Sequence, residues 1–329
     1  MKGLLPVAAF GGAMLIGFLV SLHDAYLADV FISTCLLGTL AVAWNLSAGI
    51  TGLMSLGHSL FFGISAYSVV FGLSKFKLSS WISWPLGILL AVALAAVIGG
   101  LLFRYRVKGY FFAIGTLAFA EVAFLLVSST PWLGRSDGMI LPSQTDLFRF
   151  WQFQDKWPFA VAISIILMAT LLGCALTLRT HVGFYWRAIR DNEDAAESLG
   201  VPTFRYKMWS LIVSSAISAL CGAFYANYYA FVDPRSTLGV DLSIQLLVFS
   251  IIGGMRSYWG PLLGAALLVP LSEVLRLYAG ASFHGVNLVV YAALVIVLAL
   301  RFPQGLAGLI ALRGAARARP ARLAGQPSP

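Results

Sequence analysis

The most concentrated group of charged side chains in the chain lies in residues 187–201, whose sequence is RAIRDNEDAAESLGV. The alanines and Leu199 recur at helical spacing and form a narrow stripe of small residues, while the charged residues cover the other faces. Gly200 follows the last periodic residue and Pro202 comes two residues later. The pattern therefore predicts a short charged helix that ends near Leu199.

Two interpretations fit this charged helix. Segments between apolar runs are commonly charged because they are solvated, which requires no partner. Alternatively, the helix docks on a soluble protein, since an alanine stripe lets another surface approach closely and the surrounding charges fix the register of the contact. An enzymatic role would rest on Arg190, Glu193 and His181, and these residues include no nucleophile and no metal-ligand set.

A second informative stretch is residues 45–58, whose sequence is NLSAGITGLMSLGH. Its three glycines, mixed with serine and threonine, interrupt an apolar run. A gap in a helix at membrane depth is tolerated only where it is buried in protein or faces water. The stretch therefore either borders a pathway or makes a tight contact of small residues between helices. A lone histidine such as His58 is more often structural than conducting.

Composition identifies the class of protein that must position these residues. Of the 329 residues, 60% are hydrophobic and only 11% are charged, and the mean hydropathy is +0.87. These values exclude an ordinary soluble domain and predict an all-α polytopic membrane protein. A helix needs about 20 apolar residues to cross the hydrocarbon core. We count ten candidate spans, at about 4–22, 27–46, 60–73, 82–103, 110–128, 159–178, 208–231, 242–255, 258–277 and 286–300, of which the third and eighth are short and suggest broken helices.

The distribution of lysine and arginine predicts the orientation. With the N-terminus inside, 15 of the 22 basic residues fall on the cytoplasmic side, as the positive-inside rule requires. Both termini and the helix at about 187–200 are then cytoplasmic, and residues 131–158 form a loop on the outer side. This asymmetry accounts for the net charge of +9 without a nucleic-acid partner, because the basic residues form no stripe.

We expect one transmembrane domain over residues 1–312 and a basic cytoplasmic tail over 313–329, disordered or close to anionic lipid. The three cysteines lie in apolar runs without a CxxC spacing or a nearby histidine, so we expect small buried hydrophobes. No metal or cofactor site is expected. The chain also lacks the GxxxxGK[ST] motif of a phosphate loop, so any ATP hydrolysis by that route belongs to another subunit.

Several motifs occur in the order known from one family. Besides RAIRDNE with AAESLGV, the chain carries NLxxGxxGxxSLGH, then GYFFAIGTLAFAE at residues 109–121, and GGMRSYWGPLLGA at 253–265. Together they resemble the LivM-type permease subunit of branched-chain amino-acid ABC importers over about residues 36–303. The chain departs from the family at Trp132–Arg135, where relatives carry Thr-Gly-Gly, and at Arg256, where they usually carry glycine.

The resemblance implies an ABC importer permease fold in the bacterial inner membrane. It implies a second homologous permease, two cytoplasmic ATPase subunits and a periplasmic substrate-binding protein as partners, besides membrane lipid. Glu121 should face the interior of the bundle or a water path, because a charge at that depth is costly. The residues expected to couple to the ATPases are Arg187, Arg190, Asn192, Glu193, Ala196, Leu199 and Gly200. Those expected to border the translocation pathway are Asn45, Gly49, Gly52, Ser55, Gly57, His58, Thr116 and Glu121.

The substrate stays open between branched-chain or other hydrophobic amino acids and, within the same family, urea, short amides or aromatic acids. A self-sufficient secondary transporter is the alternative of another class. It requires intramembrane carboxylates that couple ions, and the candidates are Glu121, Asp29 and Glu273.

Overall fold

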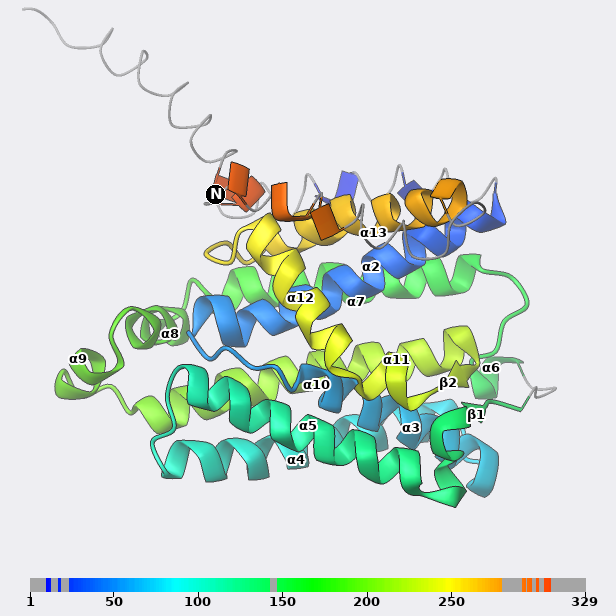
Figure 1. Cartoon of the computed structure of the whole chain (residues 1–329), viewed down its shortest axis with the longest axis horizontal. Coiled ribbons are helices and arrows are strands. Elements are labelled where there is room, and N and C mark those ends of the chain that lie inside the picture. The colour runs from blue at the N-terminus through cyan, green and yellow to red at the C-terminus, as the bar shows by residue number, and fades with distance from the viewer. Residues whose placement is uncertain are drawn as a thin grey trace, which may run out of the picture.

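The computed structural model is a bundle of long helices that run back and forth between two ends of the molecule (Figure 1). The candidate spans at 4–22 and 286–300 lie mostly outside the described residues, and the tail at 313–329 lies wholly outside them. The described residues are 10–12, 17–18, 24–142, 147–279, 292–293, 295–297, 300–301 and 305–308.

Six helices of the described part are long and apolar enough to cross a membrane. The shorter apolar helices α12 (Val240–Gly253) and α13 (Gly260–Ala279) lie beside them. The structure thus confirms a mostly helical, multi-pass chain, and the number ten for the spans remains a prediction. The six helices are α2 (Ala25–Asn45), α3 (His58–Phe76), α4 (Ser80–Arg104), α5 (Tyr110–Ser129), α7 (Trp157–Thr177) and α10 (Thr203–Tyr229).

Small elements mark the two ends of the bundle. Helices α8 (His181–Asp191) and α9 (Glu193–Ser198) project from one end, and a two-stranded antiparallel sheet lies at the other (Figure 1). The charged segment and the loop at 131–158 therefore lie at opposite ends, which agrees with the predicted order of the spans. The sheet end contains the 3₁₀ turns Pro131–Leu133 and Arg135–Asp137, β1 (Met139–Ile140), α6 (Leu147–Phe150), β2 (Phe231–Val232) and α11 (Pro234–Leu238).

Two interruptions divide the helices of the bundle. The short third run, predicted to be a broken helix, lies in the continuous helix α3, and the break lies before it; the eighth run is the short helix α12. Helix α2 continues into a π-helical turn, Leu46–Ile50, and the chain then follows an irregular path before α3 begins at His58. Helices α11 and α12 are separated at Gly239. The two broken units contact each other, since the Ser59 amide donates to Oγ of Ser243 at 3.1 Å. Polar groups freed by one break are thus satisfied inside the protein.

Helix α10 runs through the centre and packs against α2, α3 and α4. Its inner face is lined with small polar residues, and the hydroxyls of Ser210, Ser214 and Ser218 are all buried and hydrogen-bonded. Small residues let neighbouring backbones approach closely in a membrane bundle. The three cysteines are buried and unpaired, as predicted.

Candidate coupling segment and helix break

The charged segment forms two helices where the sequence predicted one. Helix α8 begins at His181 and ends at Asp191, and Asn192 then takes an extended conformation. The Asn192 side chain accepts a hydrogen bond of 3.0 Å from the Ala195 amide and so caps α9. Asparagine followed by two acidic residues is a helix-start signal, because the cap and the carboxylates satisfy the exposed amides. The predicted end is confirmed, since α9 stops at Ser198 and Gly200 has a φ of +86°.

Helix α8 is fixed to the bundle by its buried face. Trp186 and Ile189 are 2% and 5% exposed, and the indole of Trp186 donates to the Tyr206 carbonyl oxygen at 2.9 Å. Arg187, predicted to contact an ATPase, donates to the carbonyl oxygens of Gly183 and Leu178, both at 3.0 Å. Arg187 therefore closes the turn between α7 and α8.

Arg190 joins α8 to the break in α2. Its Nη1 donates to the Gly49 carbonyl oxygen at 3.3 Å, while Nε and Nη2 donate to Asp191 at 3.0 and 2.9 Å. The backbones are also close, because a Cβ placed on Gly52 would lie 3.1 Å from the Arg190 Cα. Gly52 has a φ of +84°, which glycine adopts at low cost. The two stretches singled out in the sequence are thus in direct contact.

An ion pair between a buried lysine and a partly exposed glutamate holds α9 against α10. Glu193 accepts a hydrogen bond of 2.9 Å from Nζ of Lys207, a residue that is only 3% exposed. The same ammonium lies 4.8 Å from the centre of the Phe103 ring. A buried lysine needs such a partner, because an unpaired charge in a low-dielectric surrounding is costly. Glu193 was predicted to face an ATPase, and the structure gives it this internal contact.

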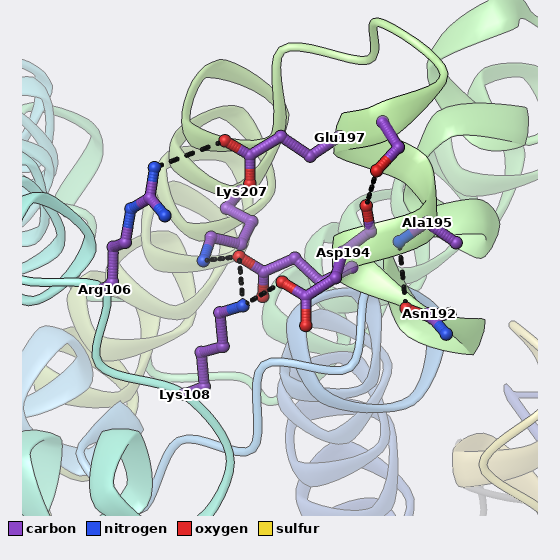
Figure 2. A network of polar contacts seen from close by, with 9 residues as sticks. Arg106, Lys108, Asn192, Asp194, Ala195, Glu197 and Lys207 are labelled. Atoms are coloured by element: carbon purple, nitrogen blue, oxygen red, sulfur yellow. Dashed lines mark hydrogen bonds and ion pairs between the residues drawn. The ribbon is translucent and has the colours of Figure 1, made fainter.

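Exposed ion pairs add a second attachment, to the connection between α4 and α5. Figure 2 shows Lys108 reaching Asp194 and Arg106 pointing toward Glu197. The distance from Nζ of Lys108 to Oδ1 of Asp194 is 2.5 Å, and the distance from Nη2 of Arg106 to Oε1 of Glu197 is 3.5 Å. The hydrogen bond with Lys108 lowers the pKa of Asp194 and raises the pKa of Lys108. Individual exposed pairs contribute little, but here they surround the pair of Glu193 and Lys207. We call this network, Arg106, Lys108, Lys207 and the acidic residues of α9, the α9 clamp.

The clamp leaves the tip of α9 uncovered. Leu199 is 86% exposed and Gly200 is exposed beside it, whereas Ala196 is 3% exposed and packs inward. Ala188 and Ala195, also part of the predicted stripe, are exposed. An exposed leucine on a rigid, charged projection is the kind of side chain that a partner surface buries.

Serine and histidine side chains hold the break from within. Nε2 of His58 lies 2.6 Å from Oγ of Ser214, whose own proton goes to the Ala43 carbonyl oxygen. The imidazole therefore donates from Nε2. Ser47 lies 3.4 Å from the same nitrogen, and Ser55 accepts from the Gly57 amide at 3.2 Å. His58 is thus fully buried and hydrogen-bonded within the protein, the surrounding that a structural histidine has.

Helices α5, α8 and α10 and the turn between α12 and α13 close around the break. Thr116 on α5 accepts from the Leu56 amide at 3.1 Å, and Asn45 donates to the Ser257 carbonyl oxygen at 3.0 Å. A Cβ on Gly57 would lie 2.5 Å from the Thr116 carbonyl oxygen, and one on Gly49 would lie 2.3 Å from that of Met255. Most of the break is therefore buried in protein and does not face water, and Gly52 is exposed at its edge.

Of the two surroundings expected for Glu121, the structure excludes the interior of the described bundle and leaves the water path as a prediction. Glu121 lies on the face of α5 that the described residues leave exposed, the same face as Ile114 and Leu125, which are 59% and 57% exposed. Helix α5 is the least covered of the six, with 22% of its apolar stretch buried against 39% or more elsewhere. The interior is excluded, because the inward face of α5 is taken by Phe112, Thr116 and Ala120.

Comparison with known proteins agrees with the helix pattern. A family described as the branched-chain amino acid transport system permease component matches residues 26–299. The chain belongs to this permease family. The match includes the break, α5, α8 and α9, so these elements lie within the shared permease region. Because six helices of the described residues are long and apolar enough to cross a membrane, this permease is a multi-pass membrane transport subunit.

Several curated proteins are similar to this permease. The high-affinity branched-chain amino acid permease protein LivM of Escherichia coli is 27% identical over 301 residues, which cover 84% of this chain and 69% of LivM. The autoinducer 2 import permease protein LsrC of an Enterobacter species is 28% identical over 282 residues, covering 80% and 77% of the two chains. No solved structure matches this permease.

Proposed function

We propose that this permease is the membrane subunit of an ABC importer that carries branched-chain or other hydrophobic amino acids across the bacterial inner membrane. Two cytoplasmic ATPase subunits supply the energy, a second homologous permease completes the pore and a periplasmic binding protein delivers the substrate. The family and the similarity to LivM support this assignment. LsrC is named for autoinducer 2, so urea, short amides and aromatic acids remain substrates to test.

The contact between Arg190 and the break carries the proposed mechanism. An ATPase that binds the exposed tip at Leu199 moves α9, and the α9 clamp together with the buried face of α8 passes this movement into the bundle. Arg190 then shifts Gly49, in the π-helical turn, and Gly52, after which the backbone follows an irregular path. Broken helices serve as hinges because a few residues absorb the change in backbone angles.

The proposed pathway lies beside the break, on the side of α5. Thr116 links α5 to the irregular backbone at Leu56, so movement of the break reaches this helix directly. The exposed face of α5 then meets the second permease, and Glu121 borders the water path between the two subunits. A carboxylate facing hydrocarbon would be costly, which supports a polar neighbour at this position.

A secondary transporter receives less support from the described carboxylates. Asp29 lies near the beginning of α2 and forms an ion pair of 2.6 Å with Lys156, so it ties α2 to α7 at the end opposite α8. Uptake by the purified permease that continues without ATP would support this alternative and contradict the importer.

The test is co-purification from native membranes. Wild-type permease should bring down an ATPase and a second permease, and Leu199→Asp should lose the ATPase while keeping the second permease. Ile140→Asp is the matched control, because Ile140 is also strongly exposed, at 74%, but lies at the opposite end in β1. If the ATPase remains bound to Leu199→Asp, the tip of α9 is not part of the docking site.

A further inference from the structure

A second feature of the α8 end is a pocket of about 990 Å³. It lies between the end of α7, helix α8 and the turn that joins α12 to α13. Four arginines line it: Arg179, Arg187, Arg190 and Arg256. Guanidinium groups are suited to phosphate, because their planar N–H donors match its oxygens and the charge is permanent.

Three of the four guanidinium groups have no carboxylate partner among the described residues. Asp191 pairs with Arg190 at 2.9 Å, whereas Arg179 and Arg256 are exposed and form no ion pair with any described residue. Arg187 is held in place by two carbonyl oxygens, which carry no full charge. The pocket thus has four cations and one neighbouring carboxylate, and two of its arginines are positioned in advance.

The remaining wall of the pocket is apolar. Ile50, Leu178, Ile251 and Met255 line it together with Tyr258 and Trp259. The pocket also lies at the ends of two apolar helices, α7 and α12, where a chain that crosses a membrane meets the headgroup region. Tyrosine and tryptophan favour that region because one part of each ring system is polar. A ligand that fits both walls has an anionic head and a hydrocarbon chain.

We propose that this pocket binds an anionic phospholipid, with the phosphate among the four arginines and an acyl chain along the apolar wall. Basic pockets at the ends of membrane helices recognise anionic headgroups in this manner. The site shares Arg187 and Arg190 with the segment predicted to couple, so a bound lipid would brace α8 against the turn before α13. The proposal concerns the chain itself and holds whether or not the transported substrate is an amino acid.

Native mass spectrometry of the full chain in mild detergent tests this proposal by titration with phosphatidylglycerol and with phosphatidylcholine of the same acyl chains. Wild type should bind one phosphatidylglycerol at least tenfold more tightly than phosphatidylcholine. Arg179→Gln with Arg256→Gln should weaken the binding of phosphatidylglycerol by about 25-fold, at about fivefold for each arginine. Arg179→Lys with Arg256→Lys should retain the preference and show that the loss is one of charge and not of folding.

The matched control is Arg104→Gln with Arg205→Gln, which removes two exposed arginines outside this pocket. Arg205 lines a different, largely apolar groove of about 730 Å³ between α7 and α10. The control should bind phosphatidylglycerol like wild type. Equal binding of the two lipids, equal weakening by the control, or inorganic phosphate binding alone as tightly as the lipid would each overturn the proposal.

Discussion

Arg190 on α8 donates a hydrogen bond of 3.3 Å to the carbonyl oxygen of Gly49, which lies 141 residues earlier in the chain. This bond connects the charged segment at the end of the bundle with the break inside it. Because the guanidinium also binds Asp191, its position is fixed from two sides.

Replacement of Arg190 tests whether this bond transmits movement. Arg190→Gln should reduce ATP-driven uptake in proteoliposomes by about tenfold or more, since coupling between sites amounts to about 1–3 kcal/mol. The ATPase subunits should still bind, because Leu199 is unchanged. Arg205→Gln, an exposed arginine on α10, is the control and should transport normally. Loss of ATPase binding in Arg190→Gln would instead place this residue in the docking surface.

Gly49 should not accept a side chain. A Cβ there would lie 2.0 Å from Oδ1 of Asn45 and 2.3 Å from the Met255 carbonyl oxygen, so Gly49→Ala should destabilise the chain by about 2–3 kcal/mol. Thermal unfolding in detergent measures the effect as a lower midpoint. Gly173→Ala is the control, because no heavy atom lies within 4 Å of its added Cβ. An unchanged midpoint for Gly49→Ala would mean that the break repacks easily.

The pair of Glu193 and Lys207 should behave as a unit. Glu193→Gln leaves the buried Lys207 ammonium unmatched and should cost about 3 kcal/mol. Lys207→Met should cost less, because the Glu193 side chain is 20% exposed and keeps Lys108 at 3.9 Å. The double variant should cost clearly less than the sum, because no charge is then left alone. Chemical denaturation of the four proteins measures the coupling. Strictly additive effects would show that the 2.9 Å contact contributes nothing.

The exposed pair of Lys108 and Asp194 predicts a pH dependence for the attachment of α9. The folded pKa of Asp194 is below its ordinary value of 3.8, so its contribution is complete above that value and is lost as the pH falls through the lowered pKa. The folded pKa of Lys108 is above its ordinary 10.5, so its contribution is lost only as the pH rises through the raised pKa. The attachment should therefore be intact between these limits.

A spin label at Ser198→Cys measures this attachment, because the three native cysteines are buried. Label mobility should rise in strong acid. Asp194→Asn should make the label more mobile at neutral pH and remove the part of the acid transition that Asp194 contributes. A transition of the same size in that variant would assign the acid response to another carboxylate.

Because Glu121 is exposed, we expect that the isolated permease does not need this carboxylate for its stability. Glu121→Gln should change the free energy of unfolding of the isolated permease by less than about 0.5 kcal/mol. Ala120→Gln, one position away but fully buried, should destabilise by about 1–3 kcal/mol. Glu121→Gln should also lower uptake by the assembled importer. A large loss of stability in Glu121→Gln would show that the carboxylate is packed inside the chain.

The sequence by itself determined the features that depend on near neighbours. Apolar runs set the helices, the glycines between 45 and 58 set the break in α2, and Gly200 with Pro202 set the end of α9. Asn192 carried a helix-start signal as well, and the separation of α8 from α9 was predictable from it. Each of these signals acts within a few residues, through backbone conformation or helical periodicity.

The tertiary structure alone decided which face of each helix meets which neighbour. Periodicity places Glu193 on a charged helix, but only the packing of α9 on α10 brings it to Lys207. In the same way, Arg190 reaches Gly49 and Glu121 remains outside because of contacts made by residues far away in the chain. Burial and ion pairing depend on three-dimensional proximity. The sequence of a membrane helix that is apolar on every side does not indicate which face is buried.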